Sequence, residues 1–430
     1  MASRAPNHIL VVGAGAAGLM AARELSRAGK KVTILEARNR CGGRIDPLPV
    51  TDFGYPAEGG AEFVHGAAPV TRGLLREAGL ALAPMGGSRW TARGGAFSQD
   101  EPRYANGDQF FRALEELKTD LPIAEFLETR FAGPHYRDLR RAITRMVEGY
   151  DAADPARAST FALRDEWMGE GQERHSQGRV AGGYGALVDF LAAECRRRGG
   201  SIHLGAIVSA IDDADGGIVA RCRDGASHVA DAAVLTVPQP LLDQIALPPA
   251  ARTKAKAASD IGYGNVVKIL LRFSAKFWTV QSGRDLSSLS FLFSEAEVPT
   301  WWTQHPAEHP VLTGWYAGPK ADRLGRLAES GLVEMGLASL AEIFGLPMDR
   351  LRSDLVAARA INWGEDEFAR GAYSYATPKT REAQSILTRP DDSGVFFSGE
   401  AVYAGADMGT AEAALASGRD TAQTILALSP

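Results

Sequence analysis

The chain has 430 residues, more than a single hydrophobic core normally supports, so two domains are expected. Of these residues 45% are hydrophobic and 23% are charged, which is typical of a globular protein. Lys and Arg number 47 against 52 Asp and Glu, so the net charge of -5 offers no basic excess to attract nucleic acid or anionic lipid.

The cysteines and the apolar runs narrow the class further. Cys41, Cys195 and Cys222 are scattered without Cys-x-x-Cys spacing, which argues against a disulfide framework and a structural zinc site. The opening run MASRAPN carries no signal-peptide apolar region, and no run reaches the roughly 18 apolar residues that a membrane helix requires. These patterns predict a soluble cytoplasmic protein that binds neither a membrane nor nucleic acid.

Residues 8–36 have the pattern of a strand, a glycine-rich turn, a helix and a second strand. The apolar run 8–12 leads into Gly13-Ala-Gly15-Ala-Ala-Gly18, and we expect a helix over 16–28 and a strand over 31–35. The first glycine permits the tight turn, the second lets the backbone approach a pyrophosphate, and the third lets the helix pack close to the strand. Glu36 follows the second strand, where a carboxylate can accept hydrogen bonds from an adenosine ribose. The spacing predicts a dinucleotide site rather than a glycine-rich turn without a ligand, and leaves NAD and FAD open.

The segments that follow carry a resemblance to a known family. The runs EARNRCGGRI (36–45), GGAEFVHG (59–66), VAGGYGALVDFLAAECRRRGGSIHLGAIVSAI (180–211), AAVLTVPQPLL (232–242) and VFFSGEAVYAGADMGTAEAALASGRDTAQTI (395–425) resemble the flavin-containing amine oxidases. The resemblance implies a Rossmann-type α/β domain that binds FAD, with a second α+β substrate domain inserted in pieces. It places the FAD-binding domain in 1–66, 180–260 and 385–430, and the substrate domain in 67–179 and 261–384.

The resemblance also assigns residues to the cofactor. The residues expected to contact FAD are Gly13, Gly15, Ala17, Gly18, Glu36, Ala37, Arg38, Gly43, Arg44, Gly60, Ala61, Glu62, Val208, Gly399, Glu400, Gly409 and Thr410. In the last run a strand over 395–397 should end at Gly399-Glu400, and a helix should begin near Gly409-Thr410, so that backbone N–H groups meet flavin and phosphate oxygens. For Glu400 the alternative is a cap on a surface loop.

The two inserted stretches differ in their predicted secondary structure. Residues 70–168 carry helical patterns over 108–131 and 136–150, which should wall a substrate cavity, and residues 261–376 contain the alternating strand 309–318, which should help form a floor beneath the flavin. His305 and His309 are flanked by prolines that oppose a helix, and no third ligand is nearby, so no metal site is expected.

Lys268 and His65 are candidate catalytic residues. In NVVKILLRF (265–273) alternation places Lys268 and Arg272 on one face, which by itself suggests a solvated face. The run resembles the family's K-x-x-L-x-F-x-x-x-F-W segment, in which the lysine holds a water beside flavin N5, so the resemblance implies that Lys268 assists oxygen chemistry. His65 lies where polyamine-oxidising relatives place a histidine near the reacting amine, and a structural role for it is weighed equally.

The run INWGEDEFARGAYSYATP (361–378) bears on the substrate. It resembles the stretch that brings a tryptophan to the flavin and an aromatic wall to the substrate, roles that fall to Trp363 and Tyr373, with ordinary core aromatics as the alternative. Relatives with covalent flavin carry a cysteine where Ala372 stands here, which implies noncovalent FAD. Thr410 stands where monoamine oxidases supply a second tyrosine, so we expect an open aromatic cage.

The implied reaction is oxidation of a primary or secondary amine to an imine, which water hydrolyses, while O2 is reduced to H2O2. The open cage favours aliphatic amines or polyamines, and Glu62 and the acidic run 365–367 are candidates for binding a second substrate cation. An L-amino-acid oxidase stays open, with Arg89, Arg93 or Arg272 clamping the carboxylate, as does a flavin-bearing protein that only binds another protein. A homodimer also stays open.

Overall fold

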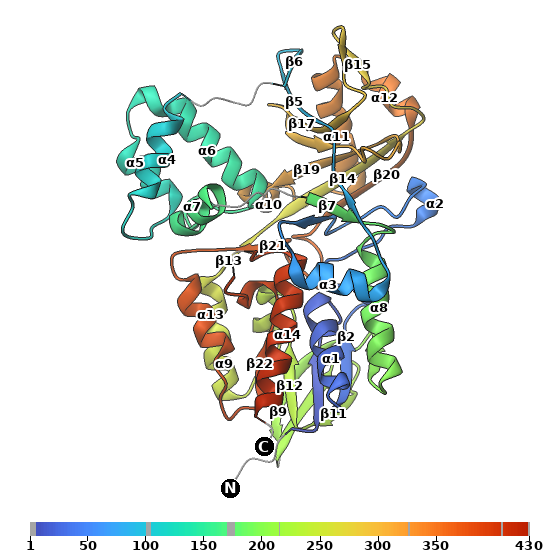
Figure 1. Ribbon diagram of the computed structural model, residues 1–430, viewed down its shortest axis with the longest axis vertical. Coiled ribbons are helices and arrows are strands. Elements are labelled where there is room, and N and C mark those ends of the chain that lie inside the picture. The colour runs from blue at the N-terminus through green and yellow to red at the C-terminus, as the bar shows by residue number, and fades with distance from the viewer. Residues whose placement is uncertain are drawn as a thin grey trace.

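The computed structural model describes residues 6–99, 105–169, 177–214, 216–325, 327–405 and 407–428. Residues 1–5 of the opening run MASRAPN, which entered the expectation of a cytoplasmic protein, lie outside these ranges. Figure 1 shows a unit built around a parallel sheet, where both ends of the chain lie, and a second unit with a mixed sheet and a lobe of helices.

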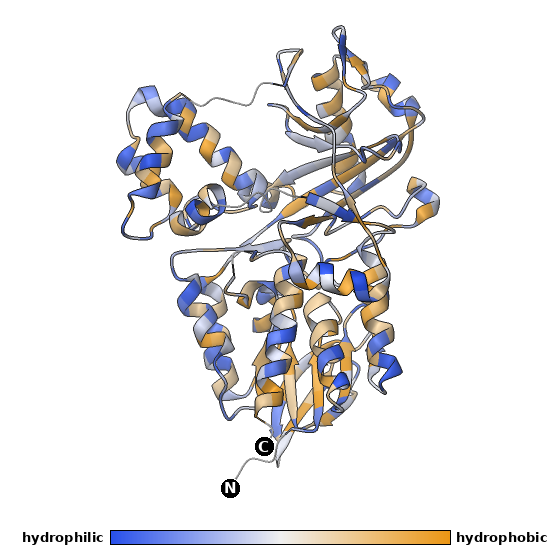
Figure 2. Cartoon of the chain, viewed as in Figure 1, coloured by the Kyte–Doolittle hydropathy of each residue, from blue (hydrophilic) through white to orange (hydrophobic). Residues whose placement is uncertain are grey.

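The first unit is built on a five-stranded parallel sheet in the order β22-β12-β1-β2-β8. Its strands are β1 (His8–Val12), β2 (Lys31–Glu36), β8 (Ser201–Leu204), β12 (Ala232–Leu235) and β22 (Val395–Phe397). Parallel strands covered on both faces have nearly continuous apolar sequences, and these strands are accordingly apolar in Figure 2. This is the Rossmann-type α/β domain that the sequence predicts.

The two faces of this sheet are covered differently. Ile9 and Val11 of β1 pack with α1 (Ala16–Arg27), α8 (Tyr184–Arg197) and α14 (Ala411–Ala427). Leu10 and Val12 point the other way, because successive strand residues alternate between faces. They pack with a three-stranded sheet of β9 (Val208–Ala214), β10 (Gly217–Cys222) and β11 (Ser227–Ala230), and with α9 (Pro249–Ala255) and α13 (Thr380–Thr388).

The second unit contains a seven-stranded sheet in the order β20-β14-β19-β18-β17-β5-β6. Its strands are β5 (Ser88–Arg93), β6 (Ala96–Ser98), β14 (Val266–Phe273), β17 (Leu289–Phe293), β18 (Thr300–Trp302), β19 (Val311–Ala317) and β20 (Leu355–Asn362). On one face of β14, Val267, Ile269 and Leu271 pack against α11 (Glu329–Phe344). The opposite face carries Lys268, which is 1% exposed, so the alternation was predicted correctly but the solvated-face alternative is wrong.

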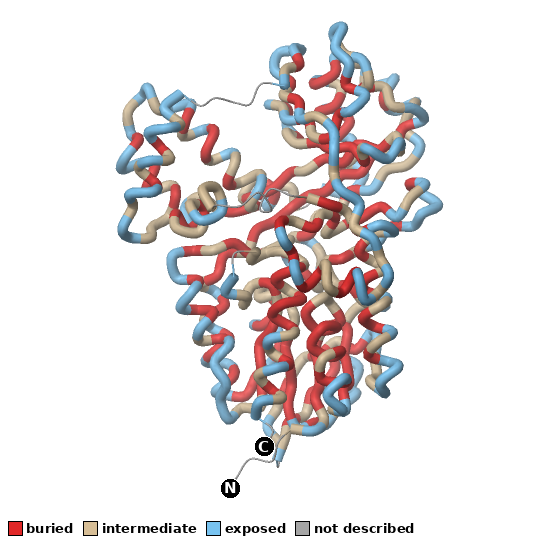
Figure 3. The backbone as a smooth tube through the Cα atoms, viewed as in Figure 1, coloured by how far each residue is buried: buried red, intermediate tan, exposed pale blue. Residues whose placement is uncertain are grey.

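The lobe of helices has an apolar core of its own. It contains α4 (Gly107–Glu115), α5 (Ile123–Arg130), α6 (Arg137–Tyr150) and α7 (Thr160–Met168), whose inward faces bury Phe110, Phe126, Ile143 and Leu163. Figure 3 shows this buried inner side. The helical pattern over 108–131 is divided in two, and Pro122 is the N-cap residue of the second helix.

Short elements connect the units. They are β3 (Phe63–His65), β4 (Leu82–Pro84) and β7 (Gln177–Val180), which form one small sheet, and β13 (Gly262–Gly264) and β21 (Tyr373–Tyr375), which form another. The sequence boundary at residue 66 assigns α3 (Pro69–Ala78) to the substrate domain, whereas its buried residues Val70, Leu74 and Leu75 pack into the core of the parallel-sheet unit. Among the described residues, the other α-helices and strands are α2 (Val50–Phe53), α10 (Pro319–Asp322), α12 (Met348–Asp354), β15 (Val280–Gln281) and β16 (Arg284–Asp285).

Within the described ranges no single helix is long and apolar enough to cross a membrane. Together α11 and α12 meet those criteria, but the pair is bent by 119° at the break between them.

Candidate active site

One continuous cavity of about 1480 Å³ runs from the glycine-rich turn after β1 to the lobe of helices. Pockets for drug-sized ligands span about 300–1,000 Å³, so this cavity has room for a dinucleotide and a second small molecule. Every sequence-predicted site residue except Gly18 lines it: Gly13, Gly15, Ala17, Glu36, Ala37, Arg38, Gly43, Arg44, Gly60, Ala61, Glu62, His65, Val208, Lys268, Trp363, Tyr373, Gly399, Glu400, Gly409 and Thr410.

The glycine-rich turn fits a dinucleotide by its geometry. Gly13 has φ +105°, a conformation that side chains rarely adopt. A Cβ on Gly18 would lie 2.0 Å from the carbonyl oxygen of Gly13, so this glycine lets α1 approach β1 and has no part in lining the cavity. Glu36 is held in place by the backbone N–H groups of Ala14 (2.6 Å) and Arg38 (2.8 Å), and its two oxygens keep lone pairs for ribose hydroxyls.

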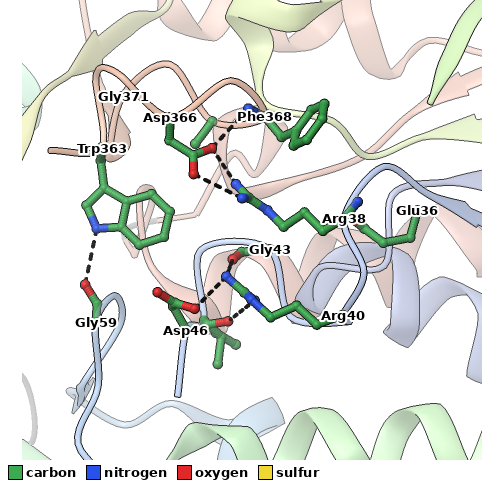
Figure 4. Close-up of polar contacts among 12 residues, drawn as sticks. Glu36, Arg38, Arg40, Gly43, Asp46, Gly59, Trp363, Asp366, Phe368 and Gly371 are labelled. Carbon is green, nitrogen blue, oxygen red and sulfur yellow. Dashed lines mark hydrogen bonds and ion pairs between the residues drawn. The ribbon is translucent and has the colours of Figure 1, made fainter. Parts of the chain in front are cut away.

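A loop from the second unit closes over the dinucleotide end, and we call residues 363–371, between β20 and β21, the strap. Figure 4 shows the Arg38 guanidinium facing the Asp366 carboxylate, with a distance of 2.9 Å from Nη1 to Oδ2. Arg38 also lies 5.5 Å from the Phe368 ring centroid, and Trp363 Nε1 donates to the carbonyl of Gly59 at 3.2 Å. The strap is therefore fixed to the cofactor-binding unit at its first residue and near its middle.

These contacts correct the interpretation of the acidic run 365–367 as a site for a second substrate cation. Asp366 pairs with Arg38, and Glu367 pairs with Arg223 at 2.9 Å. Both carboxylates are thus engaged by arginines at the dinucleotide end.

Glu400 is buried, not a cap on a surface loop. Its Oε1 accepts from Arg44 Nη1 at 2.7 Å, and the same Nη1 lies 2.6 Å from the carbonyl oxygen of Ala372. Ser374 donates to the other oxygen of Glu400. The pair therefore joins three segments at the edge of the cavity. Next to it, Thr410 caps α14, because its hydroxyl accepts from the Ala413 N–H at 3.1 Å.

Lys268 lies in a buried ionic cluster. Its Nζ donates to Glu62 Oε2 at 2.9 Å and to the carbonyl of Gly60 at 3.0 Å. Glu62 also accepts from Arg179 Nε (2.9 Å), Gln304 Nε2 (3.0 Å) and Trp302 Nε1 (3.1 Å). Burial alone would raise the pKa of Glu62, but the charges of Lys268 and Arg179 and the hydrogen bonds outweigh it and lower the pKa to about 2.

Glu62 is therefore an anion that protein donors already occupy, and it is not free for a second substrate cation. The sequence pointed to Glu62 and Lys268 separately. It did not show that they pair, and it missed Arg179, Trp302 and Gln304 altogether. The alternation of β7 and β18 carries no sign of this role, because the partners come together only in the folded sheet.

His65 lines the cavity as a neutral ring. Burial lowers its pKa to about 4, and its Nδ1 lies 3.1 Å from Gln177 Nε2. Both possible roles of His65, near the reacting amine or structural, stay open.

Of the candidate arginines, Arg89 lines the cavity with its guanidinium 5.7 Å from the Phe291 ring centroid. Arg93 also lines the cavity and lies 3.9 Å from Glu295, whereas Arg272 donates to the carbonyl of Asp52 outside the cavity.

His309 stacks on Tyr55 with ring centroids 4.4 Å apart. In the part of the chain that the structure describes, no group of three or more His, Cys, Asp or Glu residues is placed to hold a metal ion.

An acidic pair that the sequence did not reveal lies at the lobe end of the cavity. Asp151 follows α6, Glu166 lies on α7, and both line the cavity close enough for their carboxyl groups to influence each other. Burial and the nearby Glu166 raise the pKa of Asp151 well above its usual value, and burial raises the pKa of Glu166. Asp151 Oδ2 is buried without a hydrogen-bond partner.

Aromatic rings connect this pair to Lys268. Lys268 Nζ lies 5.5 Å from the Trp302 ring centroid, and Trp302 lies 5.7 Å from Trp315. Trp315 stacks on Tyr373 at 6.4 Å and 20°, and the Tyr373 hydroxyl donates to the carbonyl of Tyr150 at 2.6 Å. Tyr373 therefore forms part of a cavity wall rather than a closed core.

Comparison with known proteins agrees with this geometry. The family model for flavin-containing amine oxidoreductases matches residues 16–426. Polyamine oxidase 2 of Arabidopsis thaliana is 29% identical over 93% of this chain and 84% of its own length. The chain also has the fold of a putrescine oxidase bound to putrescine (TM-score 0.76, 21% identity, 98% of this chain and 99% of that one) and of cyclohexylamine oxidase from Brevibacterium oxydans (TM-score 0.78, 20% identity, 98% of both chains). With a dinucleotide cavity that continues past a buried lysine to an aromatic wall, the chain belongs to the flavin-containing amine oxidoreductases, FAD-dependent enzymes that oxidise amines.

Proposed function

We propose that this enzyme oxidises an aliphatic diamine or polyamine, with the reacting amine on the Lys268 side of Tyr373 and a second ammonium bound by Asp151 and Glu166. The observation that carries the proposal is that these two acidic side chains lie together on the cavity wall. We also propose that O2 accepts the electrons and yields H2O2, and that the protein is cytoplasmic, which its three free cysteines favour.

The charge of the pair selects the substrate. Burial and the nearby Glu166 disfavour the ionised form of Asp151, and a cation bound beside the two carboxyls would favour their ionised forms. An ammonium bound at the Glu166 carboxylate would supply a positive charge and hydrogen-bond donors beside the pair. Glu166 is exposed and lines the cavity beside Asp151. A ligand can therefore reach the pair.

The rest of the cavity provides an apolar path to the reacting position. Phe291, Trp302, Trp315 and Tyr373 line it and would exclude water from the methylene chain of the substrate. FAD, held by the glycine-rich turn, Glu36 and Arg44, supplies the electron acceptor for C–H oxidation. Lys268 provides a fixed ammonium at the opposite end from the acidic pair, so the two ends favour opposite charges.

An L-amino-acid oxidase is the second candidate, and Arg89 is the observation that favours it. Its guanidinium lines the cavity and could pair with a carboxylate. The acidic pair, however, would repel a carboxylate bound nearby. Relatives that oxidise polyamines and a fold relative that binds putrescine support the diamine instead.

The test compares putrescine with butylamine, which has the same carbon chain but only one amine. We expect putrescine to have the higher kcat/KM in the wild-type protein. Asp151→Asn and Glu166→Gln should lower the ratio of the two kcat/KM values about 10- to 100-fold, because a charge-assisted contact contributes roughly 1.5–3 kcal/mol. Butylamine oxidation should change little.

Asp349→Asn is the matched control, since its side chain is 96% exposed outside the cavity. It should leave the ratio unchanged. A ratio that is unaffected in the Asp151 and Glu166 variants would contradict the binding role of the pair. Preference for a free L-amino acid would favour the second candidate, and no peroxide from any amine would refute the proposed function.

A further inference from the structure

We infer that Glu62 is a positioning residue for Lys268: it fixes the lysine Nζ beside the carbonyl of Gly60 and balances the buried charge of the lysine. The inference rests on the proposed function, in which Lys268 is the charged group near the reacting centre. It adds a role to a residue that the family resemblance assigns only to cofactor contact.

The geometry shows how firmly the pair is held. Glu62 begins the stretch that enters β3, and Lys268 lies in the middle of β14, so the pair joins two sheets. Both oxygens of Glu62 are used: Oε2 by Lys268, and Oε1 by Arg179 and Gln304. With Glu62 8% and Lys268 1% exposed, neither side chain has room to turn away.

The charges show why Glu62 controls the protonation of Lys268. The cluster holds two cations, Lys268 and Arg179, around one anion. If the anion were removed, two buried like charges would remain, and this is costly in a low-dielectric interior. Arg cannot lose its proton in a protein, so Lys268 would be the group to deprotonate.

Other titratable groups lie around the cluster. Glu58 lies close enough to feel Lys268; burial raises its pKa to about 8, offset in part by Lys268 and the Tyr184 N–H, and its Oε2 has no hydrogen-bond partner. Tyr55 is influenced by Glu62, Arg179 and Glu58, and Asp46 acts on Glu58. Because the pKa of Glu58 is about 8, this residue can itself make stability depend on pH between pH 6 and pH 10. Its contribution must therefore be separated from that of Lys268.

The first test is the unfolding temperature of the holoprotein between pH 6 and pH 10 for the wild type and Glu62→Gln. A lysine with a lowered folded pKa binds fewer protons in the folded than in the unfolded state, so its cost fades as pH rises. We expect Glu62→Gln to lose several degrees at pH 6 and progressively less toward pH 10. In a Lys268→Met background the effect of Glu62→Gln should be independent of pH.

A Glu58→Gln background separates Glu58 from Lys268. The pH-dependent loss should persist there. Three outcomes would overturn the inference: a loss that is constant with pH, a pH dependence that persists in the Lys268→Met background, or a pH dependence that disappears in the Glu58→Gln background. Each would assign the effect to lost packing or to Glu58.

The second test reduces the bound flavin chemically and follows its reoxidation by O2 in a stopped-flow instrument. Reoxidation of Glu62→Gln should slow at least tenfold between pH 7 and pH 10, while the wild type changes little. Glu62→Asp keeps the charge but shortens the side chain, so it should reoxidise more slowly without the pH dependence. If Glu62→Gln does not fold, wild-type reoxidation in Glu62→Asp would still refute the positioning role. Neither test uses an amine, so failure of the proposed substrate would leave the result interpretable.

Discussion

Breaking the Arg38–Asp366 pair should loosen the strap and speed FAD release. The two guanidinium nitrogens of Arg38 face the two oxygens of Asp366, and the side chains are 15% and 23% exposed. Charged hydrogen bonds contribute about 1.5–3 kcal/mol when buried, and exposed ion pairs about 0.2–1 kcal/mol. For this half-buried fork we expect about 1–2 kcal/mol, so Asp366→Asn should release FAD roughly 5- to 30-fold faster.

The assay dilutes the holoprotein and follows the rise in fluorescence as free FAD appears. Glu367→Gln is the control, because its pair with Arg223 joins side chains that are 56% and 48% exposed. That exposed pair should change the release rate less than about fivefold. Release from Asp366→Asn at the wild-type rate would refute the reasoning that the strap holds the cofactor, as would a larger effect in the control.

Further predictions concern the cofactor and the buried acids. Acid precipitation should release FAD into the supernatant, because Ala372 offers no thiol for attachment; flavin in the pellet would contradict noncovalent binding. Glu36→Ala should give largely colourless protein, since it removes the carboxylate that Ala14 and Arg38 orient; full FAD occupancy at low FAD would argue against this role. Burial raises the pKa of Glu58 in the folded protein to about 8. Between about pH 4.5 and 8 the folded state therefore keeps a proton that the unfolded state loses. The free energy of unfolding should fall over this range by up to about 1.4 kcal/mol per pH unit. Thermal unfolding of Glu58→Gln should lack this fall, and an equally steep fall would assign it to other groups. Tyr373→Ala should lower kcat/KM for putrescine several-fold by removing a wall of the cavity, and unchanged kinetics would place Tyr373 outside the substrate path.

The cofactor end could be predicted because its residues are close together in the sequence. Gly13, Gly15 and Glu36 follow one another within a single strand–helix–strand unit, and each has a conformational or hydrogen-bonding reason to be there. The parallel sheet and the helix after Thr410 followed from the same kind of local pattern. The packing of α3 did not, because its pattern shows an apolar face but not which core receives it.

The substrate end was beyond sequence patterns because it is built from distant residues. Asp151 ends one helix and Glu166 lies on the next, and on each helix the acid resembles an ordinary polar residue. Only the fold brings both to the wall of one cavity. Alternation placed Lys268 with Arg272 correctly, but whether that face meets water depends on the segment around Gly60 that covers it.

The two acidic groups of the cavity differ in their hydrogen-bond partners, and under the proposed function this difference would orient a diamine substrate. Glu62 has a low pKa and is fully supplied with donors from Lys268, Arg179, Gln304 and Trp302. The Asp151–Glu166 pair has raised pKa values and an oxygen without a donor. A substrate ammonium gains nothing at the first and gains a charge-assisted contact at the second. A diamine would therefore enter with its charged end toward the lobe of helices and its other amine, neutral, on the side of Lys268.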